Sequence, residues 1–498
     1  MTAVAPAAMA AVTAVGEARA AQAPWAATPL DRRLACLRRL RLLIAANVDR
    51  LTDALGPRAG RHIADTLATE IAPFADAIRF LERCAPKLLR PRRLGWRGRP
   101  LWLADHAAEI RREPLGVVLV IGPSNYPLML PGIQAVQALA AGNAVVVKPG
   151  AGGGKALEAL AALAVDSGID PRLLRILSEA PEAAEAAIAA GVDKVVLTGG
   201  VRSGRAVLAA LADRLVPATM ELSGSDAVFV LPGADLDLTA RALAWGLTLN
   251  AGATCIAPRR VFVPRALAAE LERKLQPLVA RLAPAPAPAA VVDHAAFLVA
   301  AAIAAGARAI LPWSAPAPGA AQFPPAVLAD ASPDMTLLHE DVFVPVLSLV
   351  AVDTMDDALA ANAACPYALG ASVFGPAAAA QALARRIRAG VVSVNDLIAP
   401  TADPRLPFGG FGRSGFGRTR GGDGLLAMTE AKAVTLRHGK FRPHYAKAAE
   451  AEEDLLRAYM AAVHGTGWRR ARGALDLVRA LMRLARRGRA GKTGDQAG

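Results

Sequence analysis

Continuous runs of Val, Ile and Leu alternate with Ala- and Leu-rich spans along the middle of the chain. The apolar runs are 116–121, 143–148, 173–177, 194–197, 227–231, 347–352, 372–374 and 391–394. Helical spans such as 131–141 and 155–167 separate them. Buried strands that alternate with helices of this length are typical of parallel sheets covered by helices on both faces. The pattern therefore predicts an α/β protein with two doubly wound, Rossmann-like lobes.

The flanking segments follow other patterns. Residues 31–90 repeat apolar positions at helical spacing, whereas residues 92–113 alternate as a β-hairpin does. The Pro- and Ala-rich stretch 283–290 predicts a surface linker or loop. Residues 1–23 are rich in Ala and lack the charged start of a secretory signal. We therefore interpret them as a loose leader.

The segment 468–487 predicts an amphipathic helix. Its apolar side chains fall on one half of the helical wheel, and its arginines gather on the other. The two sets are Leu475, Val478, Leu481, Met482 and Leu484, and Arg472, Arg479, Arg483 and Arg486. This composition, with Trp468 at the start, is typical of a helix that lies on an anionic membrane surface. The alternative is a helix that packs its apolar stripe on the body of a dimer partner.

Composition and charge narrow the choice of function. The 498 residues carry a formal net charge of +14, and the arginines crowd into 90–112 and 469–489. Only 4% of the residues are aromatic, whereas a nucleic-acid-binding surface interleaves aromatic with basic side chains, so we expect no nucleic-acid partner. The chain has no uninterrupted apolar run of about 18 residues, which argues against a spanning helix. Its four cysteines are isolated, which favours a reducing, cytoplasmic setting with no zinc site and no disulfide framework.

The stretch N-A-G-A-T-C-I-A-P places Cys255 in an unusual context. A core cysteine usually lies within an apolar helix or strand. Cys255 instead follows Asn250, Gly252 and Thr254, which indicate a turn after the apolar segment 243–249. The sulfur therefore lies at an element boundary, where a thiolate can be reached. By itself this context is compatible with a reactive thiol or with a structural one.

Three further candidates lie beside predicted strands. Asn125, in the loop G-P-S-N-Y-P-L, is an amide donor or a cap of the next helix. The glycine turn 198–205 opens a helix and can offer N–H groups to a pyrophosphate, although its spacing is not the G-x-G-x-x-G fingerprint. Glu221 lies among apolar residues just before a predicted strand, where burial would raise its pKa toward that of a general base; pairing with an arginine is the alternative. Together with the thiol, these groups match aldehyde oxidation through a covalent thiohemiacetal and thioester.

Seven motifs, in kind and in order, resemble the aldehyde dehydrogenase superfamily over about residues 30–437. The nucleotide-side resemblance rests on G-P-S-N-Y-P-L with P-W-N-x-P-L, N-A-V-V-V-K-P with N-x-V-V-x-K-P, and L-T-G-G-V-R-S-G-R with F-T-G-S-T-x-x-G-R. The catalytic-side resemblance rests on M-E-L-S-G with E-L-G-G, E-D-V-F-V-P-V with E-E-x-F-G-P-V, and P-F-G-G-F-G-R-S-G-F-G-R with the C-terminal loop. The cysteine motif has the form common among class 3, fatty-aldehyde-type members.

The resemblance implies a role for each candidate. Cys255 would be the nucleophile, Asn125 with the Cys255 N–H would form the oxyanion hole, and Glu221 would activate the deacylating water. The residues implied in binding NAD or NADP are Lys148, Gly199, Gly200, Gly204, Asp341 and Phe343. The substrate would be an aldehyde, apolar by the class 3 likeness, and the protein would be a homodimer.

The departures from the family pattern lie mostly in the cofactor motifs. Ala151 stands where many members carry a Glu that holds the adenosine ribose, and Gly200 stands for a serine. Asp341 replaces a longer Glu, and Val344 replaces a glycine. Because a carboxylate at position 151 would repel a 2′-phosphate, its loss makes NADP an expected cofactor beside NAD.

The resemblance also implies a division into domains. Residues 24–91 and 114–222 would bind the cofactor, and 223–405 would carry the cysteine. Residues 92–113 and 406–437 would form an oligomerisation hairpin and C-terminal loop, and 438–498 a basic tail. Two other functions stay open: an acylating, coenzyme A-dependent enzyme, against which Glu221 argues, and a non-catalytic scaffold with weakened cofactor binding.

Overall fold

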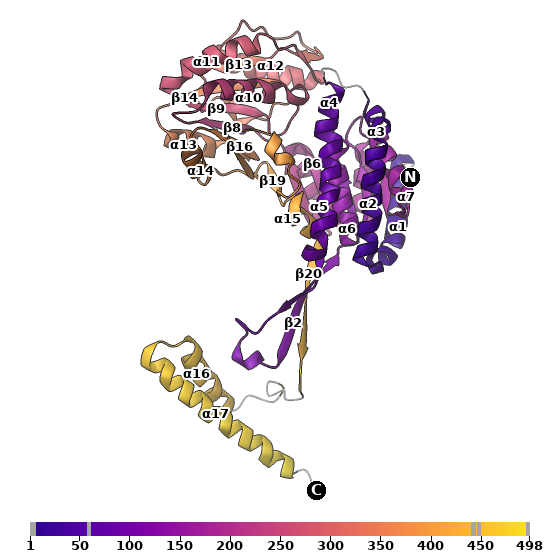
Figure 1. The fold of residues 1–498 in the computed structure, drawn as a ribbon, viewed down its shortest axis with the longest axis vertical. Coiled ribbons are helices and arrows are strands. Elements are labelled where there is room, and N and C mark those ends of the chain that lie inside the picture. Colours follow the sequence, from indigo (N-terminus) through magenta and orange to yellow (C-terminus); the bar gives the residue numbers. More distant parts are fainter. Residues whose placement is uncertain (1–5, 57–60, 440–444, 446–449, 495–498) are drawn as a thin grey trace. The chain divides into compact units, whose positions relative to one another are not determined.

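The computed structural model describes residues 6–56, 61–439, 445 and 450–494. The chain divides into two compact units. One comprises Met1–Arg92 with Glu109–Val434, and the other comprises Arg93–Ala108 with Thr435–Gly498. The first unit contains both predicted α/β lobes (Figure 1).

The first lobe is built on a six-stranded sheet. Its strands are β3 (Val117–Ile121), β4 (Ala144–Lys148), β5 (Leu174–Ile176), β6 (Lys194–Gly199), β7 (Ala218–Leu222) and β19 (Gly415–Phe416). Their order is β19-β7-β6-β3-β4-β5, and all pairs are parallel except β19 with β7. β3 lies in the middle of this order, with β4 and β5 on one side of it and β6, β7 and β19 on the other. In such a sheet a ligand binds in the crevice at the carboxyl ends of the strands, where the order reverses.

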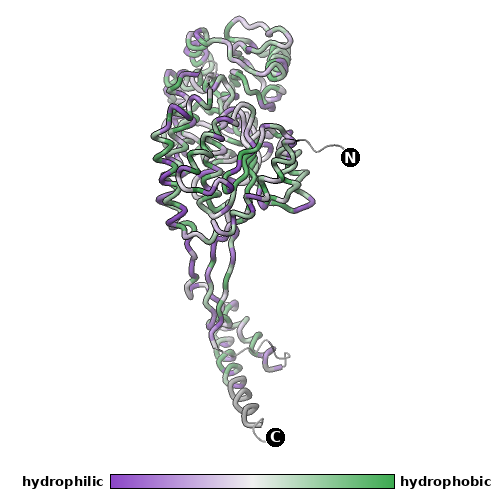
Figure 2. The backbone as a smooth tube through the Cα atoms, turned by 90° about the vertical axis from the view of Figure 1, so that its right-hand side faces the viewer, coloured by the Kyte–Doolittle hydropathy of each residue, from purple (hydrophilic) through white to green (hydrophobic). Residues whose placement is uncertain are grey.

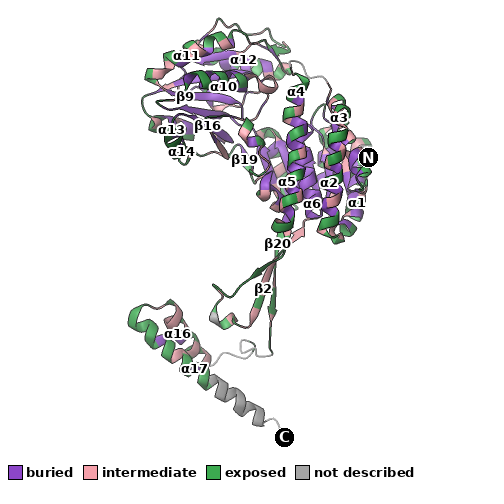
Figure 3. Cartoon of the chain, viewed as in Figure 1, coloured by how far each residue is buried: buried purple, intermediate pink, exposed green. Residues whose placement is uncertain are grey.

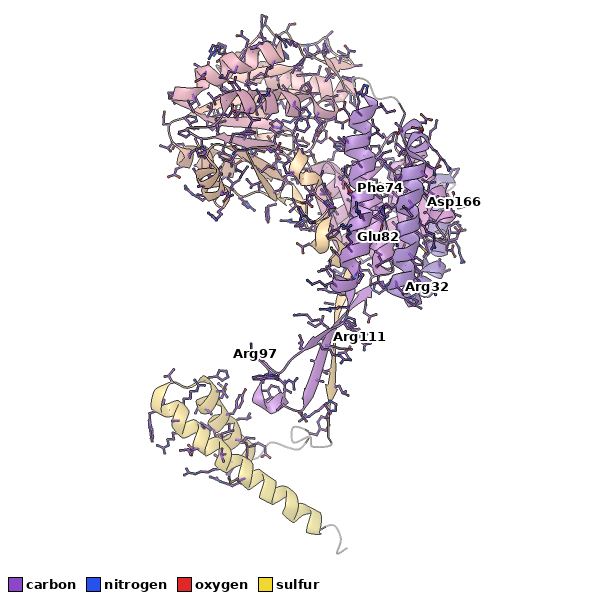
Figure 4. The ribbon with its side chains drawn as sticks, viewed as in Figure 1. Arg32, Phe74, Glu82, Arg97, Arg111 and Asp166 are labelled. Carbon is purple, nitrogen blue, oxygen red and sulfur yellow. The ribbon has the colours of Figure 1, made fainter. Side chains whose placement is uncertain are left out.

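Helices cover this sheet on both faces. They are α1 (Pro6–Ala27), α2 (Leu30–Ala46), α3 (Val48–Leu55), α4 (Ile63–Thr66), α5 (Ala72–Leu89), α6 (Met129–Ala141), α7 (Gly154–Asp166), α8 (Pro181–Ala190), α9 (Val201–Ala212) and α15 (Gly421–Leu426), with a π-helical turn over Leu67–Ile71. Phe74 of α5, labelled in Figure 4, is fully buried. A Cβ at Gly132 of α6 would lie 3.0 Å from its ring, so the glycine lets the two helices approach closely.

The N-terminal segment corrects the prediction of a loose leader. Residues 6–27 form α1, which packs against α8 and β4. Ala11, Ala14 and Ala18 are buried at helical spacing, and the Trp25 indole donates to the Leu139 carbonyl at 2.9 Å. The prediction was wrong because an Ala-rich helix has little contrast between its two faces, so its periodicity is weak.

The second lobe is built on a seven-stranded sheet. Its order is β11-β13-β14-β9-β8-β16-β17, parallel except for β11. The strands are β8 (Asp226–Val230), β9 (Pro258–Pro264), β11 (Arg308–Ala309), β13 (Ala326–Ala329), β14 (Val346–Val352), β16 (Gly370–Phe374) and β17 (Val391–Val394). The helices are α10 (Leu236–Thr248), α11 (Arg265–Val279), α12 (Ala289–Ala304), α13 (Met355–Ala364) and α14 (Ala377–Ala384). In Figure 3 the strands are mostly buried, whereas the helices expose their outer faces.

Several short elements connect these parts. They are β10 (Ala285–Pro286), β12 (Gln322–Phe323), β15 (Tyr367–Ala368), β18 (Phe411–Gly412) and the 3-10 turns Leu101–Leu103, Leu249–Gly252, Thr336–His339 and Ala399–Ala402. The predicted linker 283–290 is more ordered than expected, because it contributes β10, paired with β12, and the first residues of α12.

The remaining elements are a small sheet and two helices. β1 (Arg92–Leu94), β2 (His106–Pro114) and β20 (Thr429–Arg437) pair in the order β1-β2-β20, so a third strand joins the expected hairpin. The second unit contains α16 (Glu450–His464) and α17 (Gly467–Gly494). α17 confirms the helix predicted at 468–487, whereas α16 was not predicted. Figure 2 shows hydrophilic and hydrophobic residues interspersed along this unit.

Candidate active site

Cys255 follows a strained turn. Asn250, Ala251 and Gly252 have φ of +52°, +58° and +78° in succession. Left-handed backbone costs of order 1 kcal/mol or more at a residue other than glycine, and such strain clusters at functional sites. A Cβ at Gly252 would lie 2.6 Å from the Pro345 backbone nitrogen. The glycine that precedes the cysteine is therefore required by a close backbone approach.

A buried arginine holds this turn from one side. Arg259 donates through Nη2 to the Gly252 carbonyl at 2.5 Å and through Nη1 to the Val344 carbonyl at 2.6 Å. Two buried carboxyls lie in its electrostatic reach. Burial raises the pKa of Asp226 to about 7 and that of Asp341 to about 6, and the Arg259 cation partly opposes both shifts.

The loop after β3 holds the turn from the other side. Asn125 donates through Nδ2 to the Ala253 carbonyl at 3.0 Å, and Asn250 donates through Nδ2 to the Asn125 carbonyl at 3.0 Å. The Tyr126 and Thr254 hydroxyls lie 2.7 Å apart. The side chain and the backbone carbonyl of Asn125 are thus both hydrogen-bonded to the turn, which fixes the candidate amide donor beside the candidate nucleophile.

Glu221 precedes the buried strand β8 as predicted, but it also lies within β7, a strand that was not predicted. Its side chain is fully buried, and Oε2 accepts from the Thr419 hydroxyl at 3.0 Å. Burial raises the pKa of Glu221, whereas the Arg420 cation and the Thr419 and Thr198 hydroxyls partly offset that rise. The sequence left two alternatives for Glu221, burial among apolar residues and pairing with an arginine. The structure combines elements of both, since the carboxyl group is buried and the Arg420 cation acts on it.

The surroundings of Cys255 favour the neutral form of its thiol. Burial raises its pKa most, and the carboxylates of Glu221, Asp226 and Asp341 raise it further. Arg420 opposes them. A thiol with a raised pKa needs a neighbouring base before it can act as a nucleophile.

Two cavities meet at Cys255. The first, of about 450 Å³, is lined by Pro123, Ser124, Asn125, Leu130, Thr198, Gly199, Gly200, Glu221, Leu222, Ser223, Cys255, Ala290, Val291, His294, Asp341, Val342 and Phe343. The second, of about 200 Å³, is lined by Ala68, Thr69, Pro73, Tyr126, Met129, Leu130, Glu221, Trp245, Leu249, Thr254, Cys255, Ile256, Ile398, Ala399, Thr401, Ala402, Phe408 and Arg420. Cys255, Glu221 and Leu130 belong to both.

The first cavity brings most of the predicted residues together. Its wall contains all three predicted catalytic residues and, from the predicted cofactor set, Gly199, Gly200, Asp341 and Phe343. Gly200 precedes α9, and a Cβ there would meet open space. Backbone N–H groups at the start of a helix suit a pyrophosphate, so these residues fit a nicotinamide dinucleotide.

Two predicted cofactor residues lie outside that cavity wall. Gly204 is buried in α9, and a Cβ there would lie 2.9 Å from the Leu222 side chain, so this glycine allows close packing of α9 on β7. Lys148 lies at the end of β4 and is half-buried, and burial lowers its pKa.

Sequence reasoning missed Arg420. The residue is buried, its guanidinium lies 4.2 Å from the centre of the Phe408 ring, and Nη1 donates to the Thr401 carbonyl at 2.9 Å. Its φ of +58° is a further case of backbone strain beside the site. The only sequence signal was a second arginine two residues after Arg418, and nothing in that pattern distinguishes a buried guanidinium from an exposed one.

Comparisons with known proteins identify the family of this chain. The aldehyde dehydrogenase family matches residues 2–434. A Mycobacterium tuberculosis protein named "Putative succinate-semialdehyde dehydrogenase", with NADP(+) in its name, is 33% identical over 435 residues, which cover 84% of this chain and 83% of that protein. The 4,4'-diapolycopene aldehyde oxidase of Methylomonas sp is 30% identical over 424 residues, which cover 82% and 78%.

Solved structures show the same fold. An aldehyde dehydrogenase of Mycobacterium tuberculosis in complex with NAD+ has a TM-score of 0.79 at 28% identity, over 87% of this chain and 92% of that one. A mutant aldehyde dehydrogenase C of Pseudomonas syringae, in complex with NAD+ and octanal, has a TM-score of 0.77 at 29% identity, over 86% and 89%. The chain belongs to the aldehyde dehydrogenase family and is an NAD(P)-dependent aldehyde dehydrogenase.

Proposed function

We propose that this enzyme oxidises an apolar aldehyde to the carboxylic acid through a thiohemiacetal and a thioester on Cys255. The observation that carries the proposal is the meeting of two cavities at Cys255 and Glu221. One cavity fits the dinucleotide. The other is lined mainly by apolar side chains, which suit an aldehyde with a hydrocarbon body.

The first half of the reaction uses three side chains. Glu221 accepts the thiol proton of Cys255, because its raised pKa brings the carboxylate toward the range of a general base. The thiolate attacks the aldehyde carbon and forms the thiohemiacetal. The Asn125 amide and the Cys255 N–H stabilise the developing oxyanion, a contribution of about 3–4 kcal/mol for one such donor.

The second half regenerates the thiol. A nicotinamide cofactor held at Gly199, Gly200 and Phe343 would supply the oxidant, so that the hydride of the thiohemiacetal is removed and a thioester is left on Cys255. Glu221 releases the proton of the first half to solvent, and its carboxylate then takes a proton from water as the water attacks the thioester carbon. The acid leaves, and the thiol recovers its proton. A buried carboxyl with a raised pKa can serve both halves of the cycle.

The substrate class rests on the cavity and on two relatives. One relative is named as an oxidase of 4,4'-diapolycopene aldehyde, and one solved structure contains octanal. Both aldehydes support a substrate of the class 3, fatty-aldehyde type for this enzyme. A second candidate is an aldehyde with a distal carboxylate, as in relatives named for succinate semialdehyde. Arg420 favours it, since the guanidinium lines the cavity and its buried Nε has no hydrogen-bond partner.

A panel of aldehydes distinguishes the two. Straight-chain aldehydes of increasing length and succinate semialdehyde are assayed with NAD and with NADP, and kcat/KM is compared. We expect kcat/KM to rise with chain length. A higher value for the semialdehyde would contradict the apolar substrate, and no turnover of any aldehyde would favour a scaffold.

We also propose a cytoplasmic homodimer with peripheral membrane contact through residues 468–487. The sheet β1-β2-β20 supports the dimer, because β20 is an edge strand whose residues are mostly exposed, and such an edge is a template for pairing with another chain. No helix in the described part of the chain is both long and apolar enough to cross a membrane. Sedimentation velocity measures the mass, and a monomer would contradict the dimer.

A further inference from the structure

Glu179 is bound to the turn that follows β4. The residue lies in the loop between β5 and α8, far from this turn in sequence. Its carboxylate accepts from the Gly152 N–H through Oε2 and from the Gly154 N–H through Oε1, both at 2.9 Å. The carboxylate therefore spans the turn on both sides of Gly153.

That turn also carries Ala151. It connects Lys148, at the end of β4, with the start of α7. Position 151 is where the expected carboxylate is missing. The two oxygens of Glu179 are bound to the residue directly after it and to the residue three positions after it. A carboxylate is thus present at this turn, supplied by a neighbouring loop instead of the turn itself.

The location suits contact with a dinucleotide. Lys148 and Gly199 are the last residues of β4 and β6, and Glu179 follows β5. Because these strands are parallel, their carboxyl ends lie along one edge of the sheet. Dinucleotides lie across this edge in doubly wound sheets, with the pyrophosphate at a helix start. With the pyrophosphate at Gly199 and Gly200, the adenosine half extends either toward β4 and β5 or away from them. Lys148, which is expected to bind the cofactor, lies at the end of β4 and so favours the direction toward β4 and β5.

The charge on Glu179 is permanent near neutral pH. The Gly152 and Gly154 N–H groups lower its pKa, and the Lys148 cation lowers it further. The side chain is exposed, so a ligand can reach it. An ionised carboxylate accepts hydrogen bonds from ribose hydroxyls and repels a phosphate on the same ribose.

We propose that Glu179 is the residue that makes this enzyme prefer NAD over NADP. The carboxylate accepts from the adenosine ribose of NAD and repels the 2′-phosphate of NADP. This preference opposes the expectation from Ala151 alone. It concerns the cofactor of an established family activity and is independent of which aldehyde is oxidised.

A structural role must be separated from this one. A carboxylate on the first N–H groups of α7 also stabilises the helix. That effect changes the folded fraction and is the same whichever cofactor is present. The ratio of the two dissociation constants is unaffected by the folded fraction, so it reports the contact with the ribose alone.

The test measures binding of NADH and NADPH to Glu179→Gln by cofactor fluorescence, without aldehyde. The glutamine keeps one acceptor oxygen for the turn. We expect the ratio of the dissociation constants to move toward NADPH by about tenfold, the order of effect that one exposed like charge produces. Glu182→Gln is the matched control, since Glu182 also acts on Lys148 and starts α8. Its ratio should stay near that of the wild type.

A second variant tests the location. Adding Ala151→Glu to Glu179→Gln should restore the preference for NADH, because a carboxylate returns to the same turn. The proposal is overturned if Glu179→Gln weakens both cofactors by the same factor, or if Glu182→Gln shifts the ratio as much. A wild-type enzyme that binds NADPH more tightly than NADH would also overturn it.

Discussion

At the scale of single residues, the chemistry depends on how several charges act on one thiol. The carboxylates of Glu221, Asp226 and Asp341 raise the pKa of Cys255, and the Arg420 cation opposes them. The same cation lowers the pKa of Glu221. Arg420 therefore makes the thiol easier to deprotonate, and it also favours the ionised form of the carboxyl group that we propose takes the proton.

Arg420→Met should move the pH profile of kcat/KM to higher pH. Without the cation the pKa values of Cys255 and Glu221 both rise, so the ionised forms appear at higher pH. When such a pKa rises by about 1, the rate at a fixed pH below it falls by about tenfold. The profile is measured with one aldehyde from pH 6 to about pH 10, a range that brackets neutral and alkaline conditions.

Two variants control for packing. Arg420→Lys keeps the charge and should retain most of the original profile. Arg418→Met removes a cation from the same loop, but Arg418 stacks on Phe411 and does not act on the thiol. A profile unchanged in Arg420→Met, or shifted equally in Arg418→Met, would contradict the role given to Arg420.

Glu221→Gln should slow release of the acid more than formation of the thioester. An amide cannot accept the proton of the attacking water. In rapid mixing we expect a burst of reduced cofactor followed by a slow steady state. If the burst itself is lost, the main role of Glu221 is to deprotonate Cys255 and not to activate the deacylating water.

Cys255→Ser should lose dehydrogenase activity while still binding the cofactor. A serine hydroxyl has a far higher pKa than a thiol and no stronger base beside it. Cys84→Ser and Cys365→Ser, whose thiols lie outside both cavity walls, are the controls and should stay active. Turnover by Cys255→Ser near that of the wild type would rule out the covalent mechanism.

Local residue patterns predicted one part of the site and not the other. Asn125, Glu221 and Cys255 were candidates because each lies in a motif with its own chemistry, and the structure brings the three together in one cavity wall. Glu179 and Arg420 lie in no such motif. Their positions depend on how distant loops meet in the folded chain, and a single sequence does not contain that information.

At the scale of elements, the Cys255 turn shows why glycine is needed. Gly252→Ala should destabilise the protein and lower activity, because the new Cβ would lie 2.6 Å from the Pro345 nitrogen. Gly319→Ala is the control, since Gly319 has the same φ of +78° but open space around it. We expect Gly319→Ala to cost about 1 kcal/mol and Gly252→Ala clearly more, measured by denaturant unfolding. Equal losses would mean that backbone strain alone requires the glycine.

Element prediction succeeded for several long, continuous apolar runs, and it missed β9 and β13, which are also buried. The apolar runs of β3, β4, β8 and β14 are buried along their whole lengths or nearly so, and each was predicted within about one residue. β7 was missed because Glu221 interrupts its apolar pattern. Helix α1 was missed for the opposite reason, since alanine lies on all its faces and gives no contrast between buried and exposed positions.

At the scale of the whole molecule, the tail is the part that the family activity does not explain. α17 packs on α16 through small residues: Gly473 and Ala480 are buried, and a Cβ at Gly473 would lie 2.5 Å from the Ala461 Cβ. The predicted apolar stripe is not used in this contact. Leu475, Val478, Leu481 and Met482 are about half exposed or more, and the side chain of Leu484 lies outside the described part of the chain.

The membrane contact proposed above requires an exposed apolar stripe of this kind, and a vesicle experiment tests that contact. Full-length protein should sediment with vesicles that contain phosphatidylserine and stay in solution with neutral vesicles, because arginines bind anionic headgroups while the stripe enters the interface. A chain ending at Arg437 should stay in solution with both and keep its activity on short aldehydes. Leu481→Gln with Met482→Gln should weaken sedimentation without changing charge, and raised salt should weaken it as well. If full-length protein stays in solution at low salt, and truncation instead lowers its mass from dimer to monomer, the stripe covers a second copy of the chain and the membrane contact is wrong.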